Sequence, residues 1–444
     1  MRISTSQIFD SGALGIQNNQ SGLYKLQNQL STGRRVLTPQ DDPVAAAQAL
    51  VVSQTKDVNQ QYIENQGQAK SQLGLVDSQL SSLVNVLQEV RERVIQAGNT
   101  GTLSQSDRAT IATELESRLS EIFGIANSDN GVGEYLFSGY KGNVRPFAVD
   151  GSLAPVPPAT TNPVTYFGDD GERLLQVSSS QQMAVSAAGS DVFMVAKDGN
   201  GTFVTGVGGN TTGGINQGAA TSDAGSVLDQ QKWQAAINGF GWVVPANPAL
   251  QVRFSVAAGV TSYQLYDVSG APVAISTLKP FTSGQAIPIA STNPPAATGT
   301  DFGSQIIVQG QPANNDTFTV TPSTKQSLFQ TMQNLIGILR SPIGSSTYTA
   351  TQYSNELGAE LTNLDQSFNN ISRVQAQVGT SMQEIESLGS ASSDLDIQYQ
   401  ATLSDLQDLD YAKAISDFMN QQMNLEAAQQ SFAKISGLSL FNYL

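Results

Sequence analysis

The sequence predicts an α+β fold in which the N- and C-terminal halves form a long antiparallel helical coiled-coil bundle, with one or two small β domains inserted between them. Most of the 17 prolines and both tryptophans lie between residues 151 and 324. Proline removes a backbone donor and clashes inside a helix, so the flanking segments are free to form long helices. Those flanks carry apolar residues at alternating spacings of three and four, as coiled-coil seams do. The middle segment instead alternates apolar and polar residues, as half-buried strands do.

The two ends of the chain, residues 1–42 and 403–444, are predicted to be helical assembly arms. Each arm has one narrow apolar stripe, with a repeat of seven, on an otherwise polar helix. We expect the stripes to pair with each other and to form the assembly interface through Phe9, Ile16, Leu23, Leu30, Tyr411, Phe418, Leu425 and Phe432. Two lone helices with thin stripes bury little apolar area and are marginal in water. We therefore expect arms that are poorly ordered in the free monomer and fold when copies pack together, with docking of the arms on their own domain as the alternative.

The stretch LSTGRRVLTPQDDPVAAAQAL, residues 30–50, is predicted to be a connector between the first arm and the next helix. Its cap and connector residues are Gly33, Arg34, Arg35, Asp41, Asp42 and Pro43. Gly33 follows the last stripe residue, where helices commonly end in a left-handed conformation. Asp42 followed by Pro43 is typical of an N-cap with proline at the first helical position, and Asp41 adds negative charge near that helix end. The aspartates are therefore predicted to start a helix, not to form a catalytic or metal-binding pair.

The two adjacent arginines of the connector have two interpretations. Arg34 and Arg35 follow the end of the first helix, where cations are favoured. The other hypothesis is that they contact a neighbouring subunit at the joint between arm and core.

Residues 43–150 and 325–402 are predicted to form the helical core domain. Gly98 and Gly101 end the first long helix, and Ser104 opens the sequence SQSD, which is close to a capping box for the next helix. The predicted seams are Leu73, Val76, Leu80, Leu83, Leu87, Val90 and Val94 in the first half and Leu357, Leu361, Leu364, Phe368, Ile371, Val378, Met382 and Ile385 in the second. Because each seam needs another helix to cover it, we expect the two halves to pair.

Residues 151–324 are predicted to be a variable, β-rich insert that faces solvent. VRFSV (252–256) and DTFTV (316–320) alternate apolar and polar side chains, which is typical of half-buried strands. Residues 208–226 are rich in Gly, Ser and Thr and are predicted to be a polar loop.

No catalytic, cofactor or metal site is predicted. The chain has no Cys and no His, which excludes thiolate nucleophiles, His bases and zinc sites made from these ligands. GDDGER (168–173) and KDGNGT (197–202) lack the carboxylate spacing of a calcium loop and are predicted to be hairpin turns. The Gly-rich segments lack the GK[ST] sequence of a phosphate-binding loop. Nothing marks one carboxylate pair above the others, so we do not expect an enzyme.

Charge and hydropathy narrow the class of partner. The chain has 22 Lys+Arg against 37 Asp+Glu, a formal net charge of -15, which argues against nucleic acid or an anionic membrane as a partner. The N-terminus lacks the apolar core, about 7–15 residues long, of a secretory signal. No stretch approaches the roughly 18 apolar residues of a membrane span. We expect a soluble protein that is either cytosolic or exported without a cleaved signal, and the absence of Cys is compatible with export before folding.

Several motifs in combination resemble a known family. The 30–50 stretch, with its Leu-Ser-x-Gly turn and paired-Asp helix start, resembles the N-terminal signature of the bacterial flagellin superfamily. YLFSG (135–139) with Pro146-Phe147, DDGER (169–173), DVF (191–193), DTFTV, the run from Asp408 to Ile415 and the final LSLFNYL are similar to the FlgL-type, hook-associated protein 3 branch. The resemblance covers both helical flanks and leaves the insert less defined.

The resemblance implies a non-enzymatic structural role in the bacterial flagellum. It implies a ring-like self-assembly that joins hook and filament, contacts with a FlgK-type hook-associated protein and with flagellin, a flagellar export chaperone, and type III export to the cell exterior. The first alternative is a filament-forming flagellin, and the second is a surface adhesin on a coiled-coil stalk, for which the sequence shows neither anchor nor signal.

Overall fold

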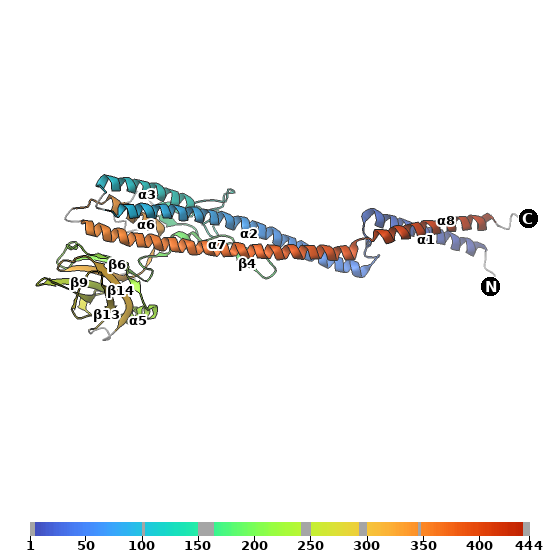
Figure 1. Ribbon diagram of the computed structural model, residues 1–444. Coiled ribbons are helices and arrows are strands. Elements are labelled where there is room, and N and C mark those ends of the chain that lie inside the picture. The colour runs from blue at the N-terminus through green and yellow to red at the C-terminus, as the bar shows by residue number, and fades with distance from the viewer. Residues whose placement is uncertain are drawn as a thin grey trace, which may run out of the picture. The chain divides into compact units, whose positions relative to one another are not determined.

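The computed structural model describes residues 5–99, 103–149, 164–240, 250–292, 300–344 and 348–437. The chain divides into two compact units: the first comprises Met1–Gly67, Gln176–Gln181 and Ile385–Leu444, and the second Gln68–Leu175 and Gln182–Glu384. Two long helices, α2 (Pro43–Ala97) and α7 (Ala350–Gln407), contribute residues to both units (Figure 1). Gly101 and the final LSLFNYL lie outside the described residues.

The first unit contains the two terminal helices, α1 (Thr5–Thr32) and α8 (Tyr411–Gly437), which pack against each other. It also contains the beginning of α2 and the end of α7. There the contact between α2 and α7 includes polar groups, since Asn59 Nδ2 donates to the Ser392 carbonyl oxygen at 2.7 Å. Gln66 Nε2 donates to the Val177 carbonyl oxygen at 2.7 Å, so the turn at 176–181 is held against α2.

The predicted seam of α2 lies in the helical core of the second unit. All seven seam residues of α2, from Leu73 to Val94, are at most 2% exposed. The helix α3 (Gln105–Ala126) begins at Ser104, whose side chain accepts a hydrogen bond from the Asp107 N–H while the Asp107 carboxylate accepts one from the Ser104 N–H. The predicted N-cap and capping box are therefore confirmed.

The seam pattern does not mark one further core helix, α6 (Leu328–Arg340), which packs against α3. Its sequence LFQTMQNLIGILR is apolar around most of its circumference, as a buried helix should be. Phe329 of α6 joins a buried aromatic group with Phe137, Phe147 and Phe193. These three phenylalanines come from the YLFSG, Pro-Phe and DVF motifs, so those motifs build part of the core.

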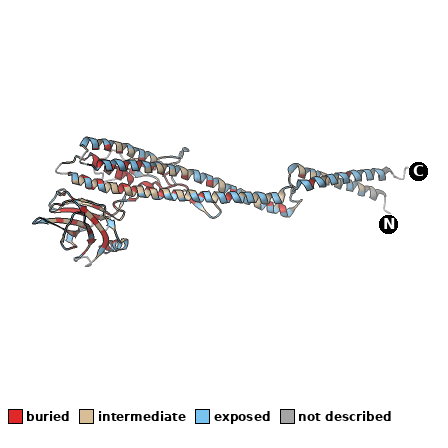
Figure 2. Cartoon of the chain, in the orientation of Figure 1, coloured by how far each residue is buried: buried red, intermediate tan, exposed pale blue. Residues whose placement is uncertain are grey.

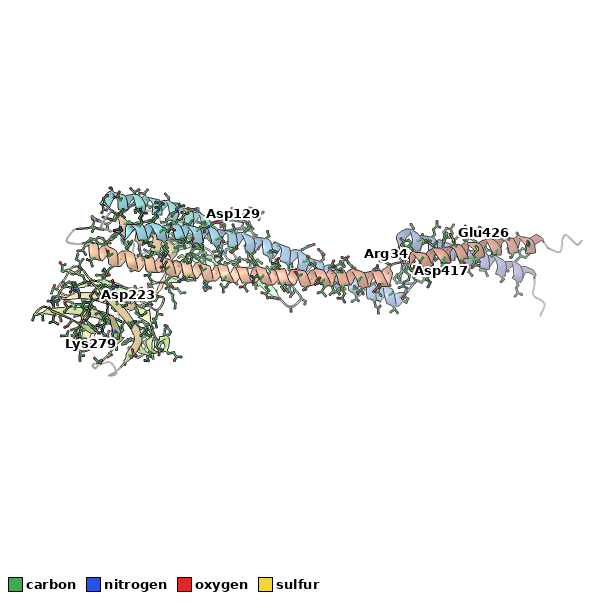
Figure 3. All side chains as sticks on the ribbon, viewed as in Figure 1. Arg34, Asp129, Asp223, Lys279, Asp417 and Glu426 are labelled. Carbon is green, nitrogen blue, oxygen red and sulfur yellow. The ribbon has the colours of Figure 1, made fainter. Side chains whose placement is uncertain are left out.

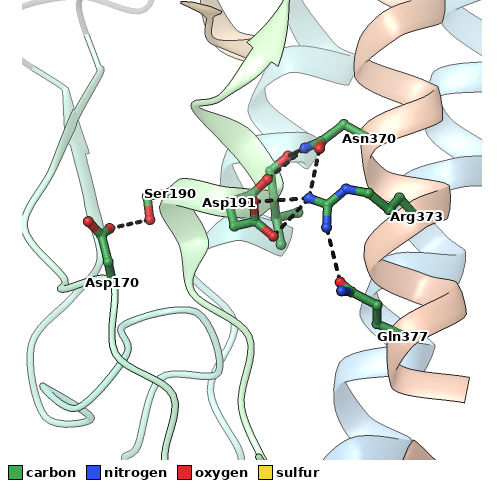
Figure 4. A network of polar contacts seen from close by, with 7 residues as sticks. Asp170, Ser190, Asp191, Asn370, Arg373 and Gln377 are labelled. Carbon is green, nitrogen blue, oxygen red and sulfur yellow. Dashed lines mark hydrogen bonds and ion pairs between the residues drawn. The ribbon is translucent and has the colours of Figure 1, made fainter. Parts of the chain in front are cut away.

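Several short elements lie between α3 and α6 in the sequence, and one of them, α4, is tied to α7 by polar contacts. These elements are β1 (Phe147–Val149), β2 (Val164–Tyr166), β3 (Leu174–Gln176), β4 (Gln182–Ala184), α4 (Gly189–Phe193), β5 (Ala196–Lys197) and β16 (Lys325–Gln326). Arg373 Nη2 lies 2.9 Å from each carboxylate oxygen of Asp191, and Asn370 Nδ2 donates to the Asp191 carbonyl oxygen at 2.6 Å (Figure 4). Gln377 accepts from Arg373 on the same face of α7. The DVF segment is thus fixed to the helical core.

The β-rich insert contains two sheets and a covering helix. Its elements are β6 (Phe203–Asn210), β7 (Thr221–Ser222), β8 (Ser226–Val227), α5 (Gln230–Phe240), β9 (Leu250–Ala257), β10 (Val260–Asp267), β11 (Val273–Ala274), β12 (Lys279–Pro280), β13 (Ala286–Ala290), β14 (Asp301–Gln309) and β15 (Asp316–Pro322). The six-stranded sheet has the order β11-β10-β9-β15-β6, with β12 also paired to β10. The four-stranded sheet has the order β13-β14-β7, with β8 also paired to β14.

One apolar core lies between these layers, as the buried residues of the insert show (Figure 2). Trp233 of α5 is 1% exposed, and its ring centroid lies 5.0 Å from that of Phe203. In β9 the predicted alternation holds at Val252 and Phe254, which are buried on either side of the partly exposed Arg253, but it fails at Val256, which is 37% exposed. The VRFSV and DTFTV strands are therefore confirmed as β9 and β15.

Two local predictions for the insert are wrong. The stretches 168–173 and 197–202 are not hairpin turns, because the strands on either side of each pair with other partners: β2 with β1, β3 with β4, β5 with β16 and β6 with β15. A tight hairpin instead joins β9 to β10 at Ala258 and Gly259, whose φ angles of 50° and 76° suit a two-residue turn. The 208–226 segment is not wholly loop, since β6 extends to Asn210 and β7 and β8 pair with β14.

Candidate assembly interface

The two terminal helices form a close antiparallel pair in the first unit. The rings of Phe9 on α1 and Phe432 on α8 meet edge to face, with centroids 5.5 Å apart. Gly12 allows this approach, because a Cβ atom there would lie 2.8 Å from the Phe432 ring. Leu425 is 9% exposed, and Gln421 Nε2 donates to Asn19 at 3.2 Å. The pairing thus combines a thin apolar contact with polar groups at its margin.

The eight predicted interface residues differ in burial within one chain. Leu425 is buried, and six are half-buried: Phe9, Ile16, Leu23, Leu30, Phe418 and Phe432. Tyr411 is 53% exposed, and its hydroxyl lies beside Gly33 at the connector. Tyr411 therefore does not continue the buried stripe, because it is the first residue of α8 and faces the joint. A role for all eight in assembly stays a prediction.

A second set of apolar side chains on the arms remains uncovered within one chain. We call it the outer arm face, and its members are 46–65% exposed: Leu14, Tyr24, Ile415, Met419 and Met423. These residues lie outside the predicted seven-residue repeat. Their apolar side chains on otherwise polar helices could have indicated a second contact surface. On α8 the residues Ile415, Met419 and Met423 follow one another at intervals of four, and such a row of exposed large apolar side chains is typical of a surface that another chain covers.

The connector pairs with the segment between α7 and α8. Gly33 has φ +69°, its N–H donates to the Gln29 carbonyl oxygen at 2.9 Å, and its own carbonyl oxygen accepts from the Leu409 N–H at 2.9 Å. The Arg35 N–H donates to the Gln407 carbonyl oxygen at 2.7 Å. The left-handed conformation at Gly33 thus turns the chain out of α1 and into a short backbone pairing.

The two aspartates of the connector have separate partners. Asp42 Oδ1 accepts from the Ala45 N–H at 3.0 Å, as an N-cap of α2 does. Asp41 Oδ1 lies 2.7 Å from Lys25 Nζ, and its Oδ2 accepts from the Thr38 N–H at 2.9 Å. The Lys25 ammonium and the Thr38 N–H lower the pKa of Asp41 to about 2. The Ala45 N–H and the Arg35 guanidinium lower the pKa of Asp42, so both carboxylates stay ionised and hold backbone in place.

The two arginines also divide in role. Arg35 Nη1 lies 3.2 Å from Asp42 Oδ2, and its Nη2 donates to the Leu406 carbonyl oxygen at 2.8 Å. The Arg34 side chain is exposed and makes no hydrogen bond or ion pair with the described residues (Figure 3). Arg35 therefore stabilises the connector of its own chain, while the Arg34 guanidinium remains available at the surface.

The described part of the chain has no group of three or more Cys, His, Asp or Glu side chains that could hold a metal ion. None of its helices is both long and apolar enough to cross a membrane.

Comparison with known proteins agrees with this arrangement of terminal helices. Residues 3–142 match the bacterial flagellin N-terminal helical region, and residues 361–444 match the bacterial flagellin C-terminal helical region. The chain belongs to the bacterial flagellin superfamily. Both matches lie on the helical flanks, and the insert falls between them.

Within the flagellin superfamily, full-length similarity is to hook-associated proteins. The chain is 26% identical to the flagellar hook-associated protein 3 of Salmonella typhimurium over 99% of both chains. It also matches the crystal structure of the flagellar junction protein FlgL from Legionella pneumophila, with a TM-score of 0.65, 27% identity, 81% of this chain covered and 100% of that one. Flagellin of Escherichia coli K12 is 36% identical, but over only 31% of this chain and 26% of its own length. The similarity thus places this flagellin-superfamily member in the hook-associated protein 3 branch.

Proposed function

We propose that this protein is a structural component of the bacterial flagellum that forms the junction between hook and filament. The observation that carries the proposal is the end-to-end match to hook-associated protein 3, in contrast with the partial match to flagellin. The Legionella relative, described as a flagellar junction protein, supports the same role. Relatives of this kind are structural proteins, and we infer a non-enzymatic role for this chain as well.

The proposed mechanism is mutual covering of the assembly arms. Within one chain the stripes of α1 and α8 pack against each other, while the outer arm face stays exposed. Covering apolar area stabilises a contact by about 25 cal/mol per Å². Neighbouring copies would gain this free energy by packing arm pairs side by side into a ring. Residues 1–42 and 403–444 would then be the assembly arms, 43–150 with 325–402 the helical core, and 151–324 the solvent-facing insert.

We infer the partners from the proposed position of this protein between the hook and the filament. We infer contacts with a FlgK-type hook-associated protein on one side and with flagellin on the other, in addition to self-assembly. We also infer a flagellar export chaperone, with export to the cell exterior and without a cleaved signal peptide. The net charge of -15 disfavours nucleic acid and anionic membranes as partners.

A deletion strain tests the junction role. Loss of swimming, with intact hooks and with flagellin shed into the medium, is the expected result, and the full-length gene should restore attached filaments. A strain that still carries attached filaments would contradict the proposal. A strain in which flagellin itself is missing from cells and medium would favour the filament-forming alternative.

A further inference from the structure

A cleft of about 500 Å³ with several polar side chains in its wall lies in the second unit, between α6 and the beginning of α7. Gln352, Glu356 and Glu360 follow one another at intervals of four on α7, and this spacing places them on one face of the helix. Gln333 and Asn334 line the opposite side from α6, and Tyr348 lies at one end. The cleft is distant in sequence from the assembly arms and has no part in the proposed function.

Three hydrogen-bond donors of this cleft are engaged with its two carboxylates. The Tyr348 hydroxyl donates to Glu356 Oε2 at 2.5 Å, and Gln352 Nε2 donates to Glu356 Oε1 at 2.9 Å. Asn334 Nδ2 donates to Glu360 Oε1 at 2.8 Å. Each of these contacts uses a donor and fixes a carboxylate at the wall of the cleft.

Acceptors remain without a partner in the same place. Gln333 is 2% exposed, and its Oε1 has no hydrogen-bond donor among the described residues. The Oε1 atom of Gln352 is also buried and lacks a donor within the described part of the chain. A buried acceptor that lacks a donor destabilises the folded state. Neither Lys nor Arg is among the described residues that line the cleft, whereas the two glutamines with unpaired oxygens and the two glutamates all line it.

We propose that this cleft binds an organic cation, a guanidinium or a primary ammonium group, through Glu356, Glu360 and the free Oε1 atoms of Gln333 and Gln352. Such a group carries several N–H donors for these acceptors, and it supplies a positive charge that no described lining residue provides. The ligand is either a free amine or a basic side chain of a partner protein, and the two sources share this chemistry.

The charge of Glu360 links this binding to pH. Burial raises the pKa of Glu360 to about 7, although Asn363, Asn334 and Gln326 donate hydrogen bonds to it. The nearby negative charges are those of Asp198 and, one turn earlier on α7, Glu356. A bound cation favours the ionised carboxylate, so binding should release a proton and tighten as the pH rises from 6 to 8.

Calorimetric titration of the full-length protein at pH 8 tests the proposal. Methylguanidinium and putrescine are the small probes, N-acetyl-arginine methylamide represents a basic side chain, and methylurea is the neutral control. We expect saturable binding of the cations, no binding of methylurea, and weaker binding at pH 6. Preference for the arginine compound over putrescine would identify a protein partner as the source, and the reverse would identify a free amine.

Variants separate binding from folding. Glu356→Gln should weaken cation binding at least tenfold, whereas Glu92→Gln, on the exposed surface of α2, should leave it unchanged. Gln333→Leu replaces the unpaired acceptor with an apolar group, so binding should fall while the thermal midpoint of the free protein holds or rises. Equal binding of methylurea, absence of saturation at millimolar cation, or unchanged affinity in Glu356→Gln would overturn the proposal.

Discussion

Lys25 and Asp41 form an ion pair with 2.7 Å between Nζ and Oδ1, and this contact ties α1 to the connector that follows it. An exposed pair of this kind contributes about 0–1 kcal/mol by itself. Asp41 also accepts backbone N–H groups of Leu37 and Thr38, so one carboxylate orders the whole turn before α2. The connector between the assembly arm and the helical core is therefore an ordered turn that specific side-chain contacts stabilise.

The first prediction concerns acid. Because the folded pKa of Asp41 is about 2 and its ordinary value is 3.8, its stabilising effect is complete above pH 4 and is lost as the pH falls toward 2. The NMR shift of the Thr38 amide proton should titrate with a midpoint near 2. Lys25→Ala removes the largest contribution, so the midpoint should move upward. A wild-type midpoint near 4, unchanged in Lys25→Ala, would disagree with the ion pair.

The second prediction concerns Gly33. With φ +69° and the Tyr411 hydroxyl 2.9 Å from the site of a Cβ atom, Gly33→Ala should destabilise the connector by about 1–2 kcal/mol. Trypsin cleavage after Arg34 and Arg35 should become roughly five- to thirtyfold faster, because the cleavage rate is proportional to the fraction of molecules in which the connector is locally unfolded. Gly15→Ala on α1 is the control, because a Cβ there meets no atom within 4 Å. Equal cleavage of both variants would show that the left-handed turn is unimportant.

The third prediction separates the two arginines. Arg35→Glu places a carboxylate beside Asp42 and removes the donor to the Leu406 carbonyl oxygen, so amide exchange at 406–409 should accelerate. Arg34→Glu should leave that exchange unchanged and, if Arg34 contacts a neighbouring subunit, should still reduce filament attachment. Normal swimming of the Arg34→Glu strain would show that Arg34 makes no contact with a neighbouring subunit that assembly requires.

The fourth prediction separates the two faces of the arms. Leu425→Asp buries a charge between α1 and α8 and should weaken their pairing by roughly 2–5 kcal/mol, with faster amide exchange along α8 and a folded 46–402 core. Met423→Asp, two residues away on the outer arm face, should leave α8 exchange unchanged. Both variants should lose filament attachment.

The two outcomes of this pair have different meanings. Attached filaments in the Leu425→Asp strain would show that assembly does not require the pairing of α1 with α8 within one chain. Attachment in Met423→Asp would show that the outer arm face is not covered during assembly.

Local features of the fold could be predicted from the sequence, because their causes lie within a few residues. The Ser104 capping box and the seam from Leu73 to Val94 depend on spacing along one helix. The position of Tyr411 could not be predicted from the sevenfold repeat, because its exposure depends on the joint with Gly33, far away in the chain.

Strand partners were the least predictable part of the insert. The segments 168–173 and 197–202 have the composition of hairpin turns, but β5 pairs with β16, more than a hundred residues later. Pairing between distant segments depends on which side chains pack together in the folded chain, as Trp233 and Phe203 do in the insert, and no local sequence pattern records such contacts. The unpaired Gln333 and Gln352 oxygens could not be predicted from the sequence either, because they arise from the packing of α6 on α7.

Immunogold labelling of isolated flagella with an antibody against the β-rich insert tests the central claim most directly. We expect gold particles in one narrow band at the boundary between hook and filament, and no label on the bare hooks isolated from the deletion strain. Label along the whole length of the filament, or no label on flagella isolated from motile wild-type cells, would contradict the assignment of this protein to the junction.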